Sequence, residues 1–175
     1  MKKMNNKGFS LVELIIVIAI MAILAGALAP ALIKYIAKSR RSSDANNCGT
    51  IQSSMQTATS DENADAAFVA LQDDTWHALP SAASGGAVTG DGDFWSIVDA
   101  DLSGGLAAFQ SAKTNKTAVG NDKIISPTYY FKVTSAGDIH VGIKGGTGSG
   151  NTNVLECVPS LDEEMGGKSG TTTVQ

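Results

Sequence analysis

A long apolar segment near the N-terminus constrains this chain more than any other feature. From Leu14 to Ile33 the sequence holds no charged residue. A helix rises about 1.5 Å per residue, so this segment would be roughly 30 Å long, which is the thickness of the hydrocarbon core of a bilayer. The sequence therefore predicts a membrane-spanning helix at about residues 14–33.

Glu13 stands directly before this segment, and a plain membrane anchor does not explain it. An ionised carboxylate in an apolar helix costs on the order of 2.5 kcal/mol or more, and such a group usually has a cationic partner. Cleavage between Gly8 and Phe9 would create one, because the new α-amine of Phe9 would lie about one helical turn before Glu13. A cut at this bond would thus supply the cation that Glu13 needs.

The N-terminus resembles that of type IV pilins, a family that includes the pseudopilins of type II secretion and competence systems. The resemblance is carried by the basic leader ending in Lys7-Gly8, by Phe9, by Glu13 and by the apolar run. It implies that the prepilin peptidase, a membrane aspartyl peptidase, cleaves after Gly8 and N-methylates Phe9. It also implies that Glu13 pairs with the Phe9 amine of a neighbouring subunit during filament assembly.

Two other interpretations of this segment are less favoured. A secretory signal peptide has an apolar core of about 7–15 residues followed by a small-residue cleavage site, whereas this core is longer and follows an acid. An ordinary N-terminal anchor leaves Glu13 without a role. A membrane-anchored surface binding protein that never polymerises is the alternative from a different functional class.

The basic residues around the apolar segment do not decide its orientation. Residues 1–8 carry three lysines and no acid, which would hold this end at the cytoplasmic surface. Four more basic residues follow the segment, namely Lys34, Lys38, Arg40 and Arg41. The family resemblance implies a precursor in the cytoplasmic membrane with its head outside, and an extracellular filament after assembly.

Gly26 and Pro30 weaken the apolar helix. Pro30 has no N–H to donate to the carbonyl of Gly26, and its ring crowds that carbonyl. The sequence therefore predicts either a simple kink or a local opening of the helix at this point. The resemblance implies that the corresponding segment, Ala22 to Pro30, unwinds in the assembled filament.

Helical periodicity continues beyond the membrane segment to about Thr59. Apolar residues recur every three or four positions, at Ala45, Cys48, Ile51 or Gln52, Met55 and Ala58. The sequence predicts a helix over residues 9–59 with a membrane half and an amphipathic half. The other segments are then a leader at 1–8, a globular head at 60–165 and a disordered tail at 166–175.

The head combines short helical and strand patterns. Acids at the start of the segment from Asp61 to Leu71 favour a short helix. Alternating apolar and polar residues at 129–133 and 138–144 predict a β-hairpin, with a third strand at 153–158. The fold class that follows is α+β, pilin-like, with one long helix packed against a small antiparallel sheet.

Candidate catalytic and metal-binding residues are few. His77 and His140 stand in unrelated segments, and no hydrolase or zinc motif accompanies them, so the sequence does not favour an enzyme. Four acids, Asp91, Asp93, Asp99 and Asp101, are weak candidates for a calcium site, but their spacing fits no EF-hand. Solvated surface acids are the favoured interpretation, and no cofactor is expected.

The charge distribution argues against direct nucleic-acid binding. From Ser42 to Gln175 there are 6 basic and 16 acidic side chains, which give the head a net charge of −10, against −4 for the whole chain. Non-specific DNA binding needs clustered cations. We therefore expect no nucleic acid among the partners of this protein.

The two cysteines form a possible disulfide. Cys48 lies on the apolar stripe of the long helix and Cys157 in the predicted third strand, so both could point into one core. A bridge that closes a loop of about 110 residues would stabilise the fold by roughly 4.7 kcal/mol in the chain-entropy model. Two buried free thiols are the alternative.

These patterns, together with the resemblance to type IV pilins, predict a structural subunit of a type IV pilus. It would wait in the membrane and then polymerise through its long helix into a homo-oligomeric helical filament. The resemblance implies an assembly platform protein and an ATPase as further partners. A pseudopilin of a type II secretion or competence system is the nearest alternative.

Overall fold

A computed structural model describes residues 9–82, 92–112, 128–144 and 154–160. The predicted leader at 1–8, the predicted disordered tail at 166–175 and the calcium candidate Asp91 lie outside these ranges. The chain divides into two compact units, residues 1–38 and 39–175. We describe each unit by itself.

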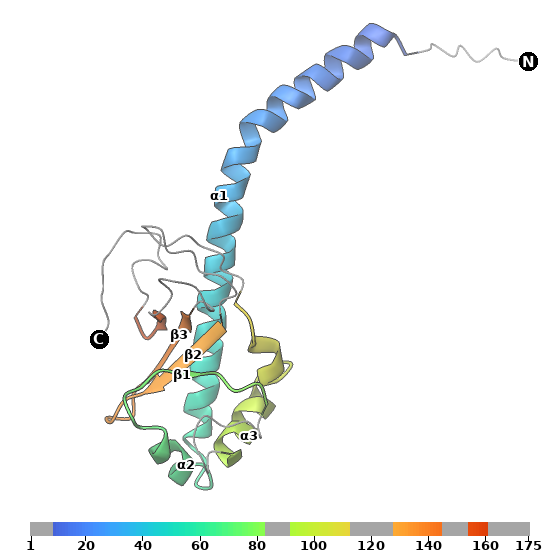
Figure 1. The fold of residues 1–175 in the computed structure, drawn as a ribbon. Helices are drawn as coiled ribbons and strands as arrows, with labels where there is room; N and C mark the ends of the chain where they lie inside the picture. The colour runs from blue at the N-terminus through green and yellow to red at the C-terminus, as the bar shows by residue number, and fades with distance from the viewer. Residues whose placement is uncertain (1–8, 83–91, 113–127, 145–153, 161–175) are drawn as a thin grey trace, which may run out of the picture. The chain divides into compact units, whose positions relative to one another are not determined.

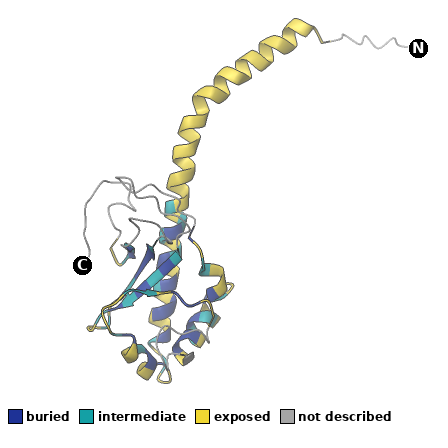
Figure 2. Cartoon of the chain, viewed as in Figure 1, coloured by how far each residue is buried: buried dark blue, intermediate teal, exposed yellow. Residues whose placement is uncertain are grey.

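The first unit consists, in its described part, of the beginning of helix α1 (Leu11–Ala58), preceded by Phe9 and Ser10. The helix continues without interruption through Gly26 and Pro30. Local unwinding at these residues is therefore not a feature of the isolated chain, and it stays a prediction for the assembled filament. Every described residue of this unit is exposed (Figure 2).

The second unit, the head, contains the rest of α1 together with a four-stranded antiparallel sheet (Figure 1). The strands are β1 (His77–Ala78), β2 (Thr128–Val133), β3 (Ile139–Lys144) and β4 (Leu155–Val158), in the spatial order β1-β2-β3-β4. Two short helices, α2 (Asp65–Ala70) and α3 (Gly92–Asp101), and the 3₁₀ helix η1 (Leu106–Phe109) complete the described part. The predicted α+β class, with a long helix against a small antiparallel sheet, is confirmed.

The hairpin of β2 and β3 forms where the alternating pattern predicted it. Its register pairs Thr128 with Lys144 and Val133 with Ile139. The turn is closed by a hydrogen bond from the Gly137 amide to the Thr134 carbonyl, and Gly137 has a φ of +90°, which glycine adopts without strain. One face of the hairpin is buried in the core, and its residues are Tyr129, Phe131, Val133, Ile139, Val141 and Ile143.

The α1 residues within the head supply the other side of the core. Cys48, Ile51, Met55 and Ala58 are fully buried, as predicted from the stripe. Ala45 is an exception, because it is half-buried while its neighbour Asp44 is the buried residue at that end of the stripe. Polar contacts fix the helix further: Gln52 donates to the Ile139 carbonyl at 2.8 Å and Ser54 to the Val98 carbonyl at 3.2 Å.

Helix α3 places two aromatic residues at the centre of the core. Phe94 and Trp95 are fully buried, and the Trp95 ring lies 4.9 Å from that of Phe131 on β2, centroid to centroid. Phe94, Trp95 and Val98 are therefore part of the core, whereas Ser96 on the same helix is exposed. Helix α2 begins at Asp65 and not at Asp61, since the Asp61 carboxylate accepts the Asn63 amide in the preceding turn.

Candidate functional site

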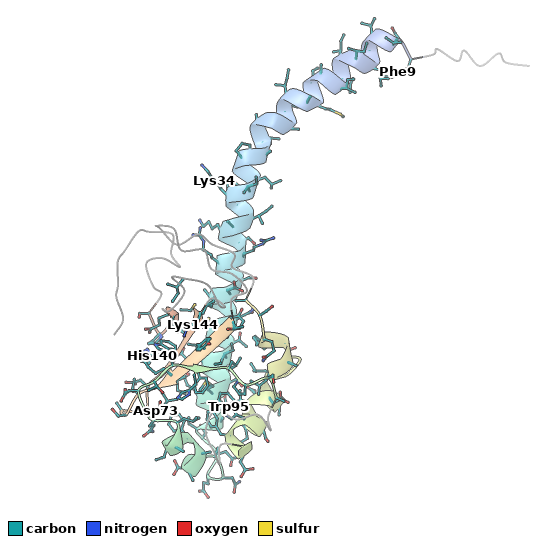
Figure 3. The ribbon with its side chains drawn as sticks, viewed as in Figure 1. Phe9, Lys34, Asp73, Trp95, His140 and Lys144 are labelled. Carbon is teal, nitrogen blue, oxygen red and sulfur yellow. The ribbon has the colours of Figure 1, made fainter. Side chains whose placement is uncertain are left out.

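The structure describes two residues of the predicted motif, Phe9 just before α1 and Glu13 in its first turn. Phe9 lies two residues before the first residue of α1 and is 78% exposed (Figure 3). Glu13 is exposed in the first helical turn, where a carboxylate interacts favourably with the positive end of the helix dipole. Gly8, the residue before the predicted cut, lies outside the described residues.

Glu13 also holds the end of its own helix. The Ser10 amide donates to Oε2 of Glu13 at 2.9 Å, and the Ser10 carbonyl accepts the Leu14 amide at 3.2 Å. Ser10 is thus the N-cap residue, and Glu13 reaches back to it as in a capping box. The sequence analysis missed this contact although the Ser-x-x-Glu pattern before an apolar run is its known signal.

The apolar surface behind this turn is not covered by any part of the chain that the structure describes. Large apolar side chains are exposed from Phe9 to Ile36, with Leu11 and Ile23 each 72% exposed. Among the described residues, α1 is the one helix that is long and apolar enough to cross a membrane. Exposed apolar surfaces of this extent typically mark sites of contact with lipid or with other protein.

The remaining candidate residues lie in the head, and the structure brings some of them together. Cys48 and Cys157 are both buried, and each is a free thiol. Both belong to one cluster of buried residues, and interaction with the Cys157 thiol, together with burial, raises the pKa of Cys48. The predicted proximity is therefore present, and the bridge itself stays a prediction.

The acids proposed as calcium ligands have different surroundings. Asp93, Asp99 and Asp101 all belong to α3. Asp99 accepts the Leu106 amide at 2.7 Å through Oδ1, so it joins α3 to η1. Within the described ranges no group of three or more His, Cys, Asp or Glu side chains is placed to hold a metal ion. Calcium binding stays a prediction without a described ligand set.

The two histidines each pair with a carboxylate at a different place in the sheet. Nε2 of His77 lies 2.8 Å from Oδ2 of Asp73, and the Thr75 hydroxyl donates to the same oxygen at 2.7 Å. Burial acts to raise the pKa of Asp73, but hydrogen bonds from Thr75 and His77 outweigh it and lower the pKa. Nδ1 of His140 lies 2.8 Å from Oε1 of Glu156 and joins β3 to β4.

A buried polar cluster that the sequence analysis did not find joins α1 to β2. The Tyr129 hydroxyl donates to Oδ1 of the fully buried Asp44 at 3.0 Å and accepts from the Asn47 amide at 2.9 Å. Burial, aided by the charge of Asp44, raises the pKa of Tyr129. Nothing in the local sequence marks Asp44 as buried, because its partner lies 85 positions away.

Comparison with known proteins bears on the N-terminal segment. Residues 3–29 match the prokaryotic N-terminal methylation motif. Searches of curated proteins and of solved structures gave no match. The matched residues span the end of the leader, Phe9, Glu13 and most of the apolar segment, which is the part of the chain that carries the exposed apolar surface. The match supports a chain of the type IV pilin or pseudopilin type, with a leader that is cleaved and an N-terminus that is methylated.

Proposed function

We propose that this protein is a structural subunit of a type IV pilus that polymerises through the first part of α1. The observation that carries the proposal is the exposed apolar surface from Phe9 to Ile36, headed by an exposed carboxylate at Glu13. In the membrane, lipid would cover this surface. In a filament, the same surface of neighbouring subunits would cover it.

Transfer of the helix from lipid to a bundle of helices has little hydrophobic driving force, because lipid tails are as apolar as leucine. The carboxylate of Glu13 changes this balance, since a charge near the apolar part of a bilayer is costly until it finds a partner. The α-amine of a cleaved Phe9 in a neighbouring subunit would provide that partner. Assembly would thus be driven by the relief of an unpaired charge.

The methylation motif implies processing by prepilin peptidase. We propose that an assembly platform protein and an ATPase then extract the subunit from the cytoplasmic membrane into an extracellular filament. The basic residues Lys34 and Lys38, both exposed, would lie near lipid head groups before extraction. A pseudopilin would use the same surface, and the place where the polymer accumulates separates the two functions.

The test is to shear the surface of cells that express the chain, image the released material and identify the fibre protein by mass spectrometry. We expect fibres whose subunit begins with N-methylphenylalanine at Phe9. Fibres that remain within the envelope and appear at the surface after overproduction would indicate a pseudopilin. A chain that is cleaved but stays monomeric in the membrane would contradict both functions and indicate an anchored binding protein.

A further inference from the structure

The two cysteines of this chain meet in the core of the head, although they stand far apart in the sequence. Cys48 is on α1 and 0% exposed, and Cys157 is on β4 and 3% exposed. Both belong to one cluster of buried residues that also holds Ile51 and Val141. The Cys157 thiol donates to the Leu155 carbonyl of its own strand at 3.8 Å, and its interaction with Cys48 raises the pKa of the Cys48 thiol.

An irregularity in the sheet coincides with Cys157. Val141 pairs with Val158 and the next residue, Gly142, pairs with Glu156, so Cys157 is an extra residue without a Cα partner. A β-bulge of this kind re-aims a side chain and is a structural feature in its own right. Cys157 is buried, whereas its neighbours Glu156 and Val158 are half-buried. The bulge therefore coincides with the one β4 side chain that is buried in the core beside α1.

Strand β4 is held in the sheet by few interactions, so a covalent link would stabilise it. It has four residues, and in the described sheet it is an edge strand that pairs with β3 alone. Short edge strands are held by few hydrogen bonds and open more easily than central strands. A covalent link from β4 to α1 would join the last described strand to the long helix that forms the other side of the core.

We propose that Cys48 and Cys157 are a site of covalent modification, and that an exported disulfide oxidant joins them into a disulfide as the head folds. One thiol loses its proton and forms a bond to one sulfur of the oxidant, and the second sulfur of the oxidant leaves as a thiol. The other cysteine then displaces the first sulfur. In total the two protein thiols lose two electrons and two protons, and the oxidant disulfide gains them.

Burial sets the time at which this reaction can take place. Exchange requires a thiolate that the oxidant can reach. In the folded head both sulfur atoms are covered, and the raised pKa of Cys48 keeps its thiol protonated. Oxidation therefore takes place while β4 folds onto α1, before the two thiols are buried. Once the head has folded, the reduced and oxidised forms exchange slowly, through opening of β4.

The test uses the full chain in detergent, unfolded and reduced, and then refolded with oxidised glutathione or with reduced glutathione as the probe. After oxidising refolding, alkylation in denaturant should label no thiol, and mass spectrometry should find a loss of two hydrogens and a peptide pair that links Cys48 to Cys157. Reduction of this product should lower the thermal midpoint of the head by on the order of 10 °C. Two labelled thiols, or two glutathione adducts, would overturn the proposal.

Matched variants and a kinetic measurement complete the test. Cys48→Ala and Cys157→Ala should each keep one modifiable thiol, and their thermal midpoints should not depend on the reductant. If a variant does not fold, the comparison of oxidised and reduced wild-type chain still decides the question. Folded reduced chain should react with oxidised glutathione at least about 100-fold more slowly than unfolded chain. Equal rates would contradict oxidation during folding. These readouts do not depend on filament formation, so they are independent of the proposed function.

Discussion

Residues 11–36 and the head use their apolar side chains in different ways. In α1, Leu11 and Ile23 remain 72% exposed, whereas the head buries Ile51, Trp95 and Phe131 completely. Full burial of one such side chain contributes about 1.5–3 kcal/mol. The head obtains this free energy from contacts within the chain, as an ordinary soluble domain does.

In the proposed function, the exposed part of α1 obtains it from lipid or from other copies of the chain. The two regions should therefore respond differently to amino-acid substitutions. Substitutions in the head should alter the stability of the monomer, and substitutions in the first turns of α1 should alter processing and assembly. The following predictions test this separation, beginning with the largest expected effect.

Gly8→Val should abolish maturation, because a branched side chain beside the scissile bond obstructs the peptidase. We expect the processed fraction to fall close to zero, measured by intact mass of the membrane-bound chain. Gly26→Ala is the matched control, since a Cβ at Gly26 meets nothing within 4 Å. Normal cleavage of Gly8→Val would show that the peptidase does not act at this bond.

Glu13→Val should leave membrane insertion intact and sharply reduce incorporation into filaments, because the amine of Phe9 in the neighbouring subunit loses its counter-charge. Glu13→Gln sharpens the test, since an amide oxygen can still accept the Ser10 amide without carrying a charge. If charge pairing drives assembly, Glu13→Gln should fail like Glu13→Val, and Glu13→Asp should be intermediate. Filament yield in sheared fractions is the measurement.

A near wild-type yield from Glu13→Gln would contradict charge pairing and would leave the capping contact as the role of Glu13. Ser10→Ala is a control for helix-end effects, because loss of an N-cap side chain typically costs about 0.5–2 kcal/mol and leaves the Glu13 charge in place. It should therefore reduce filament yield less than Glu13→Val does.

Two glycine substitutions test the head, with opposite signs. In Gly142→Ala the new Cβ would lie 2.6 Å from the Leu155 carbonyl oxygen and 2.6 Å from Cγ1 of Val154, so β3 and β4 must shift. We expect a loss of roughly 1–3 kcal/mol in the free energy of unfolding. Gly49→Ala meets nothing within 4 Å inside α1 and should stabilise the head by about 0.5–1 kcal/mol.

Denaturant titration of the full chain in detergent measures both effects, and neither variant should change cleavage after Gly8. Wild-type stability of Gly142→Ala would contradict the close approach of β4 to β3 at Gly142. A destabilised Gly49→Ala would mean that space beside that residue is filled in the folded protein.

The smallest effect concerns pH. The pKa of Asp73 is lowered below its ordinary value of 3.8, because Thr75 and His77 favour the charged carboxylate. A lowered folded-state pKa gives stability that is present above the ordinary value and is lost as the pH falls through the folded value. Asp73 is exposed, so the contribution is small. In Asp73→Asn, the thermal midpoint should fall less steeply with decreasing pH below about pH 4 than in the wild-type chain. The same pH dependence in both chains would contradict this role of Asp73.

Much of this molecule follows from local sequence patterns. The apolar segment, Glu13 and the hairpin were predictable from short stretches of sequence. In each stretch, the spacing of the apolar residues matches either a helix or a strand. The Ser10 and Glu13 contact is local too, and its pattern was available. The extent of α1 to Ala58 agreed with the predicted end near Thr59 because its buried stripe repeats with helical spacing.

By itself the sequence determined the apolar segment, the N-terminal methylation motif and the class of the fold, since these depend on periodicity and on short motifs. The tertiary structure alone decided that Asp44 is buried beside Tyr129, that Trp95 lies against Phe131 and that a bulge at Cys157 coincides with its burial beside Cys48. Each of these contacts joins residues at least 36 positions apart. Such contacts depend on how helices and strands pack, and no local pattern contains that information.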